Sequence, residues 1–191
     1  KPTIYKGLLD IYCSCSKFVV KPQLSKGGLN QIDLTNVKKR GGEFIESDLA
    51  TAASDPELVR KTVEEIVELS EDRKSWLVFS SGVDHAHMLA NEFDYHDIEV
   101  AVITGGDSSK VREKTIADFK SGKIKCLINV NVLTTGFDHP AVDVVALVRA
   151  TASTGLYVQM IGRGTRIAEG KTDCLVLDFG ANVERHGFID K

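Results

Sequence analysis

Short runs of apolar residues alternate with helix-like segments through most of the chain. The runs cover residues 76–79, 100–103, 124–130, 142–148 and 174–177. Before and between them, apolar residues recur at intervals of three and four, which is the spacing of an amphipathic helix. A strand that is apolar on both faces must be covered on both sides, and in an alternating chain this predicts a parallel sheet. We therefore predict an α/β fold with a doubly wound, mostly parallel sheet over residues 72–180.

The first 53 residues form a separate region in this pattern. They are weakly periodic and are interrupted by glycine pairs at 27–28 and 41–42, so we predict an irregular N-terminal extension with one short strand near 29–34. A helix is predicted to begin after Ser54, because Ser54 and Glu57 can form a capping box and Pro56 is tolerated in a first turn. The expected domain organisation is a connecting region over 1–53 and an α/β domain over 54–191.

Composition excludes several classes of protein. Of 191 residues, 42% are hydrophobic and 27% are charged, which is the balance of a globular chain and not of a disordered, collagen-like or coiled-coil one. No apolar run approaches the roughly 20 residues that span a membrane, and the first residues lack the apolar centre of a signal peptide. We expect a soluble, cytoplasmic protein with no membrane partner. Because the sequence begins at Lys1 and not at Met, we also expect it to be part of a longer polypeptide.

Charge is distributed unevenly around a formal net value of −3. Residues 1–40 carry a net charge of +6, residues 41–100 carry −11 and residues 101–191 carry +2. The acidic stretch coincides with the first predicted helix, and a run of this kind usually forms a solvated face. A polyanionic ligand would avoid this face and bind elsewhere on the surface.

The cysteines and histidines do not indicate a metal centre. Cys13 and Cys15 have the spacing of at most half a zinc site, so we expect reduced structural thiols. His85 and His87 stand two apart, and side chains with that spacing point to different sides of a helix. We interpret both as surface histidines of a helix and predict no metal site.

Polar residues follow two of the predicted strands, and ligands of such sheets bind beyond the carboxyl ends of the strands. Ser80, Ser81 and Gly82 suit a phosphate, although small residues also cap helices for structural reasons alone. After the third strand, the adjacent hydroxyls of Thr134 and Thr135 can approach a nucleic-acid backbone. An ordinary turn would explain the Gly and Pro of this loop, but not the pair of threonines.

Two arginines near the end of the last long helix carry the strongest signal. Arg163 and Arg166 are three residues apart and are separated by Gly164, so they lie on the same side of the helix end. Arginine is favoured over lysine where a phosphate is recognised by several donors in one plane. A structural ion pair would account for the presence of one arginine here, but it accounts poorly for two. We therefore predict that the pair binds a compact anion.

These segments resemble a known family. Residues 77–81 are similar to motif IV, residues 131–138 to motif V, and Gln159-x-x-Gly162-Arg163-x-x-Arg166 to motif VI of superfamily two helicases. The motifs occur in the order found in the second RecA-like domain of those motors. The Gln-led motif VI and the tail over 177–187 resemble bacterial and phage DNA helicases of the RadD type most closely. The resemblance covers roughly residues 74–191.

The resemblance implies a role for each matching residue. Arg163 and Arg166 would act as arginine fingers toward the γ-phosphate of ATP. Gly136, Asp138, Gln159 and Gly162 would lie at the nucleotide, with Asp138 at the ribose. Nucleic-acid phosphates would be contacted by Ser80, Ser81, Gly82, Thr104, Gly105, Thr134 and Thr135. Many relatives have Thr and Asp where this chain has Val130 and Asn131, which moves the expected phosphate contact to the two threonines.

The motifs that hold ATP itself are absent from the sequence. No Gly-x-x-x-x-Gly-Lys-Ser/Thr segment is present, and no Asp-Glu pair follows a strand to bind Mg²⁺. We therefore expect this chain alone to be inactive, with ATP and Mg²⁺ held mainly by an N-terminal RecA-like domain of the same polypeptide.

The predicted function is that of the C-terminal motor domain of an ATP-dependent DNA helicase or translocase, acting on single- or double-stranded DNA, with RNA the less favoured substrate. Three alternatives stay open from the sequence: a translocase subunit of a restriction system, a nucleic-acid-binding α/β module without motor activity, and a regulatory domain that binds a small nucleotide.

Overall fold

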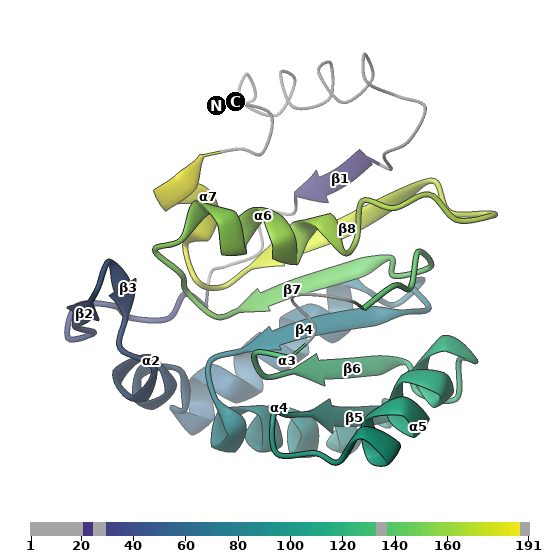
Figure 1. Cartoon of the computed structure of the whole chain (residues 1–191), viewed down its shortest axis with the longest axis horizontal. Helices are drawn as coiled ribbons and strands as arrows, with labels where there is room; N and C mark the ends of the chain where they lie inside the picture. Colours follow the sequence, from purple (N-terminus) through teal and green to yellow (C-terminus); the bar gives the residue numbers. More distant parts are fainter. Residues whose placement is uncertain (1–20, 25–29, 133–136, 188–191) are drawn as a thin grey trace.

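A six-stranded parallel sheet forms the centre of the computed structural model, which describes residues 21–24, 30–132 and 137–187. The strands, in the order in which they lie side by side, are β1 (Lys21–Leu24), β8 (Asp173–Asp178), β7 (Val144–Val148), β4 (Trp76–Ser80), β6 (Cys126–Asn129) and β5 (Val100–Ile103). Figure 1 shows all of their arrows pointing the same way. The doubly wound parallel sheet predicted from the apolar runs is confirmed.

Helices cover both faces of this sheet. They are α3 (Pro56–Leu69), α4 (Val83–Tyr95), α5 (Ser109–Lys120), α6 (Thr154–Gly162) and the short α7 (Asn182–His186). In β4, Trp76 and Val78 pack on the side of α3 and α4, while Leu77 and Phe79 pack on the side of α5 and α6. Every residue of β4 is buried, because successive side chains enter opposite cores. Figure 1 shows α3 and α4 behind the sheet and α5 and α6 in front.

The chain changes direction across the sheet at β4. From β4 it passes to β5 and returns to β6, and it then crosses to β7 on the other side of β4. The described part of the β6–β7 connection runs over the α5/α6 face, since Phe137 and Val142 pack in that core. Because the chain crosses the sheet here, the β6–β7 connection lies between α5 and α6. The candidate site is in this connection and at the end of α6.

Helix α3 begins one residue later than the capping prediction required. Asp55, and not Ser54, has the extended backbone of the N-cap, and its carboxylate accepts a hydrogen bond from the Leu58 backbone amide at 2.9 Å. The Ser54 hydroxyl instead donates to the carbonyl of Ala50 at 2.7 Å. The prediction of a Ser54 cap was therefore wrong, because either side chain can cap a helix and the path of the preceding residues selected Asp55.

The acidic stretch forms an exposed face on α3, as the charge pattern predicts. Arg60 lies between Glu57 and Glu64 one turn away on either side and forms ion pairs with both. The Arg60 guanidinium lowers the pKa of Glu57 to about 2. These groups lie away from the polar residues that the sequence assigned to ligands.

Residues 30–53 pack on the sheet instead of extending from it. They contain β2 (Lys39–Arg40), β3 (Glu43–Phe44) and α2 (Glu46–Ala53), and residues 30–34 contain no strand. Ile32, Leu49 and Ala53 are buried together with Ala150, which follows β7. Figure 1 shows β2, β3 and α2 at the end of the sheet to which the strand arrows point. The segment therefore covers part of the edge at which a ligand was expected.

Candidate nucleotide and nucleic-acid site

Arg163 lies directly after α6 and is turned into the protein. Only 9% of it is exposed, and its Nη1 donates a 2.6 Å hydrogen bond to the backbone carbonyl of Phe137. Burial lowers the pKa of Arg163, the nearby charge of Arg166 lowers it further, and Asp138 opposes both effects. Arg163 therefore joins the end of α6 to the β6–β7 connection, 26 residues away in sequence.

Arg166 is the more exposed of the two arginines. Its side chain is 39% exposed and forms an ion pair with Asp138, whose side chain is 69% exposed. Arg163 and Arg166 thus contact consecutive residues of one segment, Phe137 and Asp138. The sequence placed both guanidinium groups outward as a clamp, but in the structure Arg166 is presented to solvent and Arg163 is buried.

Gly164 is required between the two arginines because the backbone passes directly over the sheet. A Cβ atom at this position would overlap the Cys174 sulfur on β8 and would lie 2.8 Å from Cγ2 of Val145 on β7. A Cβ atom at Gly162, by contrast, would meet no such neighbour within 4 Å. The Gly164 backbone therefore packs directly on the side chains of Cys174 and Val145, and this contact sets how far from the sheet the chain continues to Arg166.

Aromatic packing holds the other side of the segment that bears Asp138. Phe119, near the end of α5, lies with its ring centroid 6.3 Å from Phe137 and 5.1 Å from His139. His139 is half-buried, and burial together with the charge of Lys120 lowers its pKa. The segment over 137–139 is therefore held between α5 and the end of α6, with the Asp138 side chain left exposed.

The small residues at the end of β4 and directly after it are buried. Ser80 and Ser81 are 0% and 1% exposed, and their hydroxyls donate to the carbonyls of Gly82 and Val148 at 3.2 and 2.9 Å. A Cβ at Gly82 would lie 3.0 Å from that of Ala50 on α2. Helix α2 therefore packs against the turn that the sequence assigned to a phosphate.

His85 also belongs to this buried turn, so its interpretation as a surface histidine was wrong. It is 1% exposed, and its Nδ1 accepts a 3.2 Å hydrogen bond from the Ser81 backbone amide. Burial lowers the pKa of His85 to about 4. His87 is exposed, as predicted. His85 and His87 differ in exposure because α4 packs only one of its faces on the sheet. His85 lies on that face and His87 does not.

The remaining predicted residues lie in separate places. Thr104 is partly exposed and Gly105 is exposed after β5, where the Thr104 hydroxyl accepts from the Gly106 amide at 3.2 Å. Gln159 is exposed on α6, and Gly162 is its last residue. The assignments to Thr134, Thr135 and Gly136 lie outside the described residues. The structure thus brings Asp138, Arg163 and Arg166 together and leaves the β4 and β5 ends apart from them.

Asn131, which departs from the family pattern, has a structural role of its own. It has a positive φ of 58°, and its side chain donates to Glu46 of α2 and accepts from Arg149 after β7. Asn is among the few non-glycine residues that adopt this backbone readily. The side chain therefore ties α2 to the carboxyl end of the sheet.

Glu43 makes a second connection of this kind that sequence reasoning missed. Its carboxylate accepts from the Thr151 hydroxyl at 2.6 Å and from the amides of Ala152 and Ser153 at 2.7 and 3.2 Å. These hydrogen bonds lower its pKa in spite of the opposing effect of burial. A single acidic residue in an irregular segment gives no local signal, since its partners are more than 100 residues away.

Neither a metal site nor a membrane span is found in the part of the chain that the structure describes. No group of three or more His, Cys, Asp or Glu side chains is placed to hold a metal ion within residues 21–24, 30–132 and 137–187. Among the same residues, no helix combines the length and the apolar character that crossing a membrane requires.

Known helicases are similar to this chain in sequence. Residues 58–168 match the family model described as the helicase conserved C-terminal domain. A Schizosaccharomyces pombe protein named irc3, provisionally a mitochondrial ATP-dependent helicase, is 40% identical over 119 residues, which is 62% of this chain and 20% of that protein. A Saccharomyces cerevisiae protein, IRC3, provisionally an ATP-dependent helicase, is 31% identical over 153 residues, or 78% of this chain and 22% of that protein.

A solved structure supports the fold. A fragment of a protein assigned provisionally as the HsdR subunit of a type I restriction enzyme from Vibrio vulnificus YJ016 matches with a TM-score of 0.66 and 20% identity, covering 90% of this chain and 34% of that one. This chain spans about a fifth of the length of the two yeast relatives. The family match covers more than half of the chain. The chain therefore belongs to the helicase conserved C-terminal domain family.

Proposed function

We propose that this chain is the C-terminal motor domain of an ATP-dependent helicase or translocase that acts on DNA, and that Arg166 reaches the γ-phosphate of ATP bound by an N-terminal RecA-like domain of the same polypeptide. The observation that carries the proposal is the partly exposed Arg166 guanidinium, held beside Asp138 at the end of motif VI. ATP and Mg²⁺ would be held mainly by the other domain, since the phosphate-binding loop is absent from this sequence.

The Arg166–Asp138 pair can open at small cost to admit a phosphate. Both side chains are substantially exposed, and exposed ion pairs contribute about 0–1 kcal/mol. A triphosphate carries more charge than one carboxylate, so it competes well for the guanidinium. Once released, the Asp138 carboxylate can accept a hydrogen bond from a ribose hydroxyl. The residues present therefore fit the terminal phosphate and sugar of a nucleotide.

Arg163 contributes differently from Arg166 in this proposal. Its hydrogen bond to Phe137 fixes the segment that carries Asp138, so it holds the site together from inside. Gln159 and Gly162 lie on the same helix, and we propose that they line the interface with the ATP-binding domain.

The DNA would pass along the edge of the sheet at which the β-strands have their carboxyl ends. We propose that Thr104 and Gly105, which are accessible after β5, contact its phosphates together with Thr134 and Thr135 of motif V. Gly136 would lie at the nucleotide with Asp138. Ser80, Ser81 and Gly82 would support this edge from beneath α2. Contacts to phosphates make binding independent of base sequence and weaker at high salt.

Arg166→Ala in the complete polypeptide tests the proposal. An arginine finger is worth about 10³–10⁵ in turnover, so we expect most of the DNA-stimulated ATPase activity to be lost while the dissociation constant for single-stranded DNA stays within about twofold. Arg60→Ala is the matched control, because Arg60 is also paired with carboxylates but lies on the exposed face of α3. Wild-type turnover in Arg166→Ala contradicts the finger assignment. If RNA stimulates the ATPase activity and DNA of the same sequence does not, the choice of DNA as substrate is wrong. The proposed motor role is not contradicted by that result.

A further inference from the structure

Lys171, which no motif includes, lies among three backbone carbonyls. Its Nζ donates to the carbonyl oxygens of Gly164 at 2.7 Å, Pro140 at 2.9 Å and Arg166 at 3.0 Å. An ammonium group has three donors, so these bonds use its full capacity. Burial lowers the pKa of Lys171, whereas Asp143 and Asp173 favour its charged form.

The three acceptors belong to the two segments that form the candidate site. Pro140 stands two residues after Asp138, and Gly164 and Arg166 are part of motif VI. The Lys171 ammonium therefore connects the end of motif V to the end of motif VI through backbone carbonyls, in addition to the Arg166–Asp138 ion pair between side chains. Without this group, three carbonyls with their lone pairs would face one another across a partly buried space, which is unfavourable.

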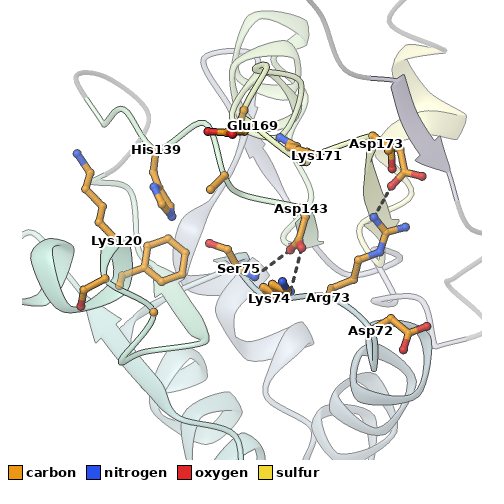
Figure 2. Close-up of a pocket in the computed structure, with 17 residues that line it drawn as sticks. Asp72, Arg73, Lys74, Ser75, Lys120, His139, Asp143, Glu169, Lys171 and Asp173 are labelled. Carbon is orange, nitrogen blue, oxygen red and sulfur yellow. Dashed lines mark hydrogen bonds and ion pairs between the residues drawn. The ribbon is translucent and has the colours of Figure 1, made fainter.

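Lys171 stands two residues before Asp173, the first residue of β8. It lines a cavity of about 610 Å³ next to the amino-terminal ends of β4, β7 and β8. Figure 2 shows the Lys171 side chain among the residues that line this cavity. On the floor of this cavity, the Asp143 carboxylate accepts from the amides of Lys74 and Ser75, both at 2.9 Å. An ion pair between Arg73 and Asp173 closes the side where β8 begins. The backbone amide of Lys171 itself donates to the Ala168 carbonyl at 3.2 Å, in the turn that leads into β8.

We propose that Lys171 is a positioning residue for the reaction assigned above: it sets the place of the Arg166 backbone relative to Asp138, and so the distance at which Arg166 meets the phosphate. This inference rests on the proposed function. A misplacement of about 1 Å at a catalytic group can lower a rate about 10²-fold. A lysine that only stabilised the fold would not have this effect on a correctly folded enzyme.

The test is Lys171→Met in the complete polypeptide, because Met has similar length and no donors. We expect kcat of the DNA-stimulated ATPase to fall about 10- to 100-fold. The KM for ATP and the affinity for single-stranded DNA should stay within about twofold of the wild-type values. The double variant with Arg166→Ala should be no slower than Arg166→Ala alone, since Lys171 acts through that arginine. Lys123→Met is the control, because Lys123 is an exposed lysine paired with Asp118 on α5.

A second measurement needs no nucleotide. The Arg166 Nε–H resonance in the nucleotide-free protein should shift or broaden in Lys171→Met and stay unchanged in Lys123→Met. If Lys171→Met does not fold, Lys171→Arg replaces it, because a planar guanidinium cannot direct its donors to three carbonyls as an ammonium does. We expect a several-fold loss of kcat in that variant also.

Each result decides between the two proposals. Three results would overturn the positioning role and leave the proposed function intact. They are an unchanged kcat in the folded Lys171 variant, an unchanged Arg166 resonance, and a double variant whose loss of kcat is the product of the two single losses. Wild-type turnover in Arg166→Ala overturns the proposed function, and the role of Lys171 with it.

Discussion

Gly164 offers the sharpest test of how motif VI is held on the sheet. In Gly164→Ala, the new methyl group would overlap the Cys174 sulfur and lie 2.8 Å from Cγ2 of Val145. An ordinary carbon–carbon contact is about 3.5 Å, so the backbone or the strands must move by about 0.7 Å at Val145 alone. Both neighbours are 0% exposed and lie on central strands, where neither can give way easily.

We expect Gly164→Ala to destabilise the chain by about 1–3 kcal/mol, the usual range for overpacking a core. For a domain of this size, that corresponds to a fall in Tm of about 2–12 °C. Urea unfolding followed by the fluorescence of Trp76, the sole tryptophan and a fully buried one, measures it. Gly162→Ala is the control, because its methyl group has open space and should leave stability unchanged or higher.

A double variant separates the clash from other effects of the alanine. In a Cys174→Ala background, the sulfur is gone and the Cys174 Cβ lies 3.4 Å from the new methyl group, so Gly164→Ala should cost less there. The difference between the two backgrounds should be about 0.5–3 kcal/mol. An equal cost in both, or a cost below about 0.5 kcal/mol in the wild-type background, refutes the close-packing explanation.

Two further predictions concern stability. Asp55→Ala removes the cap on Leu58 and should cost about 1 kcal/mol in urea unfolding, whereas Asp55→Asn should cost little; equal losses would mean that the cap is not the cause. For His85, the pKa of about 4 in the folded state lies below the unfolded value of about 6.5, so stability present above pH 6.5 is lost as pH falls toward 4, by up to about 3 kcal/mol. The slope of unfolding free energy against pH between 6.5 and 5 should flatten in His85→Gln, and identical slopes would contradict this.

The sheet was predictable because its signal is local. The run 144–148 is apolar at every position, short and rich in valine, which is typical of a strand covered on both faces. The resemblance to motifs V and VI pointed to Asp138 and Arg166, which the fold brings into contact. The N-cap of α3 was missed by one residue, because Ser54 and Asp55 are both capable caps and the difference lies in the backbone that precedes them.

The amino-acid sequence was therefore sufficient to predict the order of strands and helices from α3 to β8, the parallel sheet and the family. The tertiary structure alone decided that Arg163 turns inward to the Phe137 carbonyl, that α2 covers the turn after β4, and that Lys171 joins three carbonyls. Apolar periodicity recurs every few residues and can be read along a chain. A hydrogen bond from a side chain to a distant backbone carbonyl leaves no such pattern, since every residue offers the same carbonyl and only the folded path selects one.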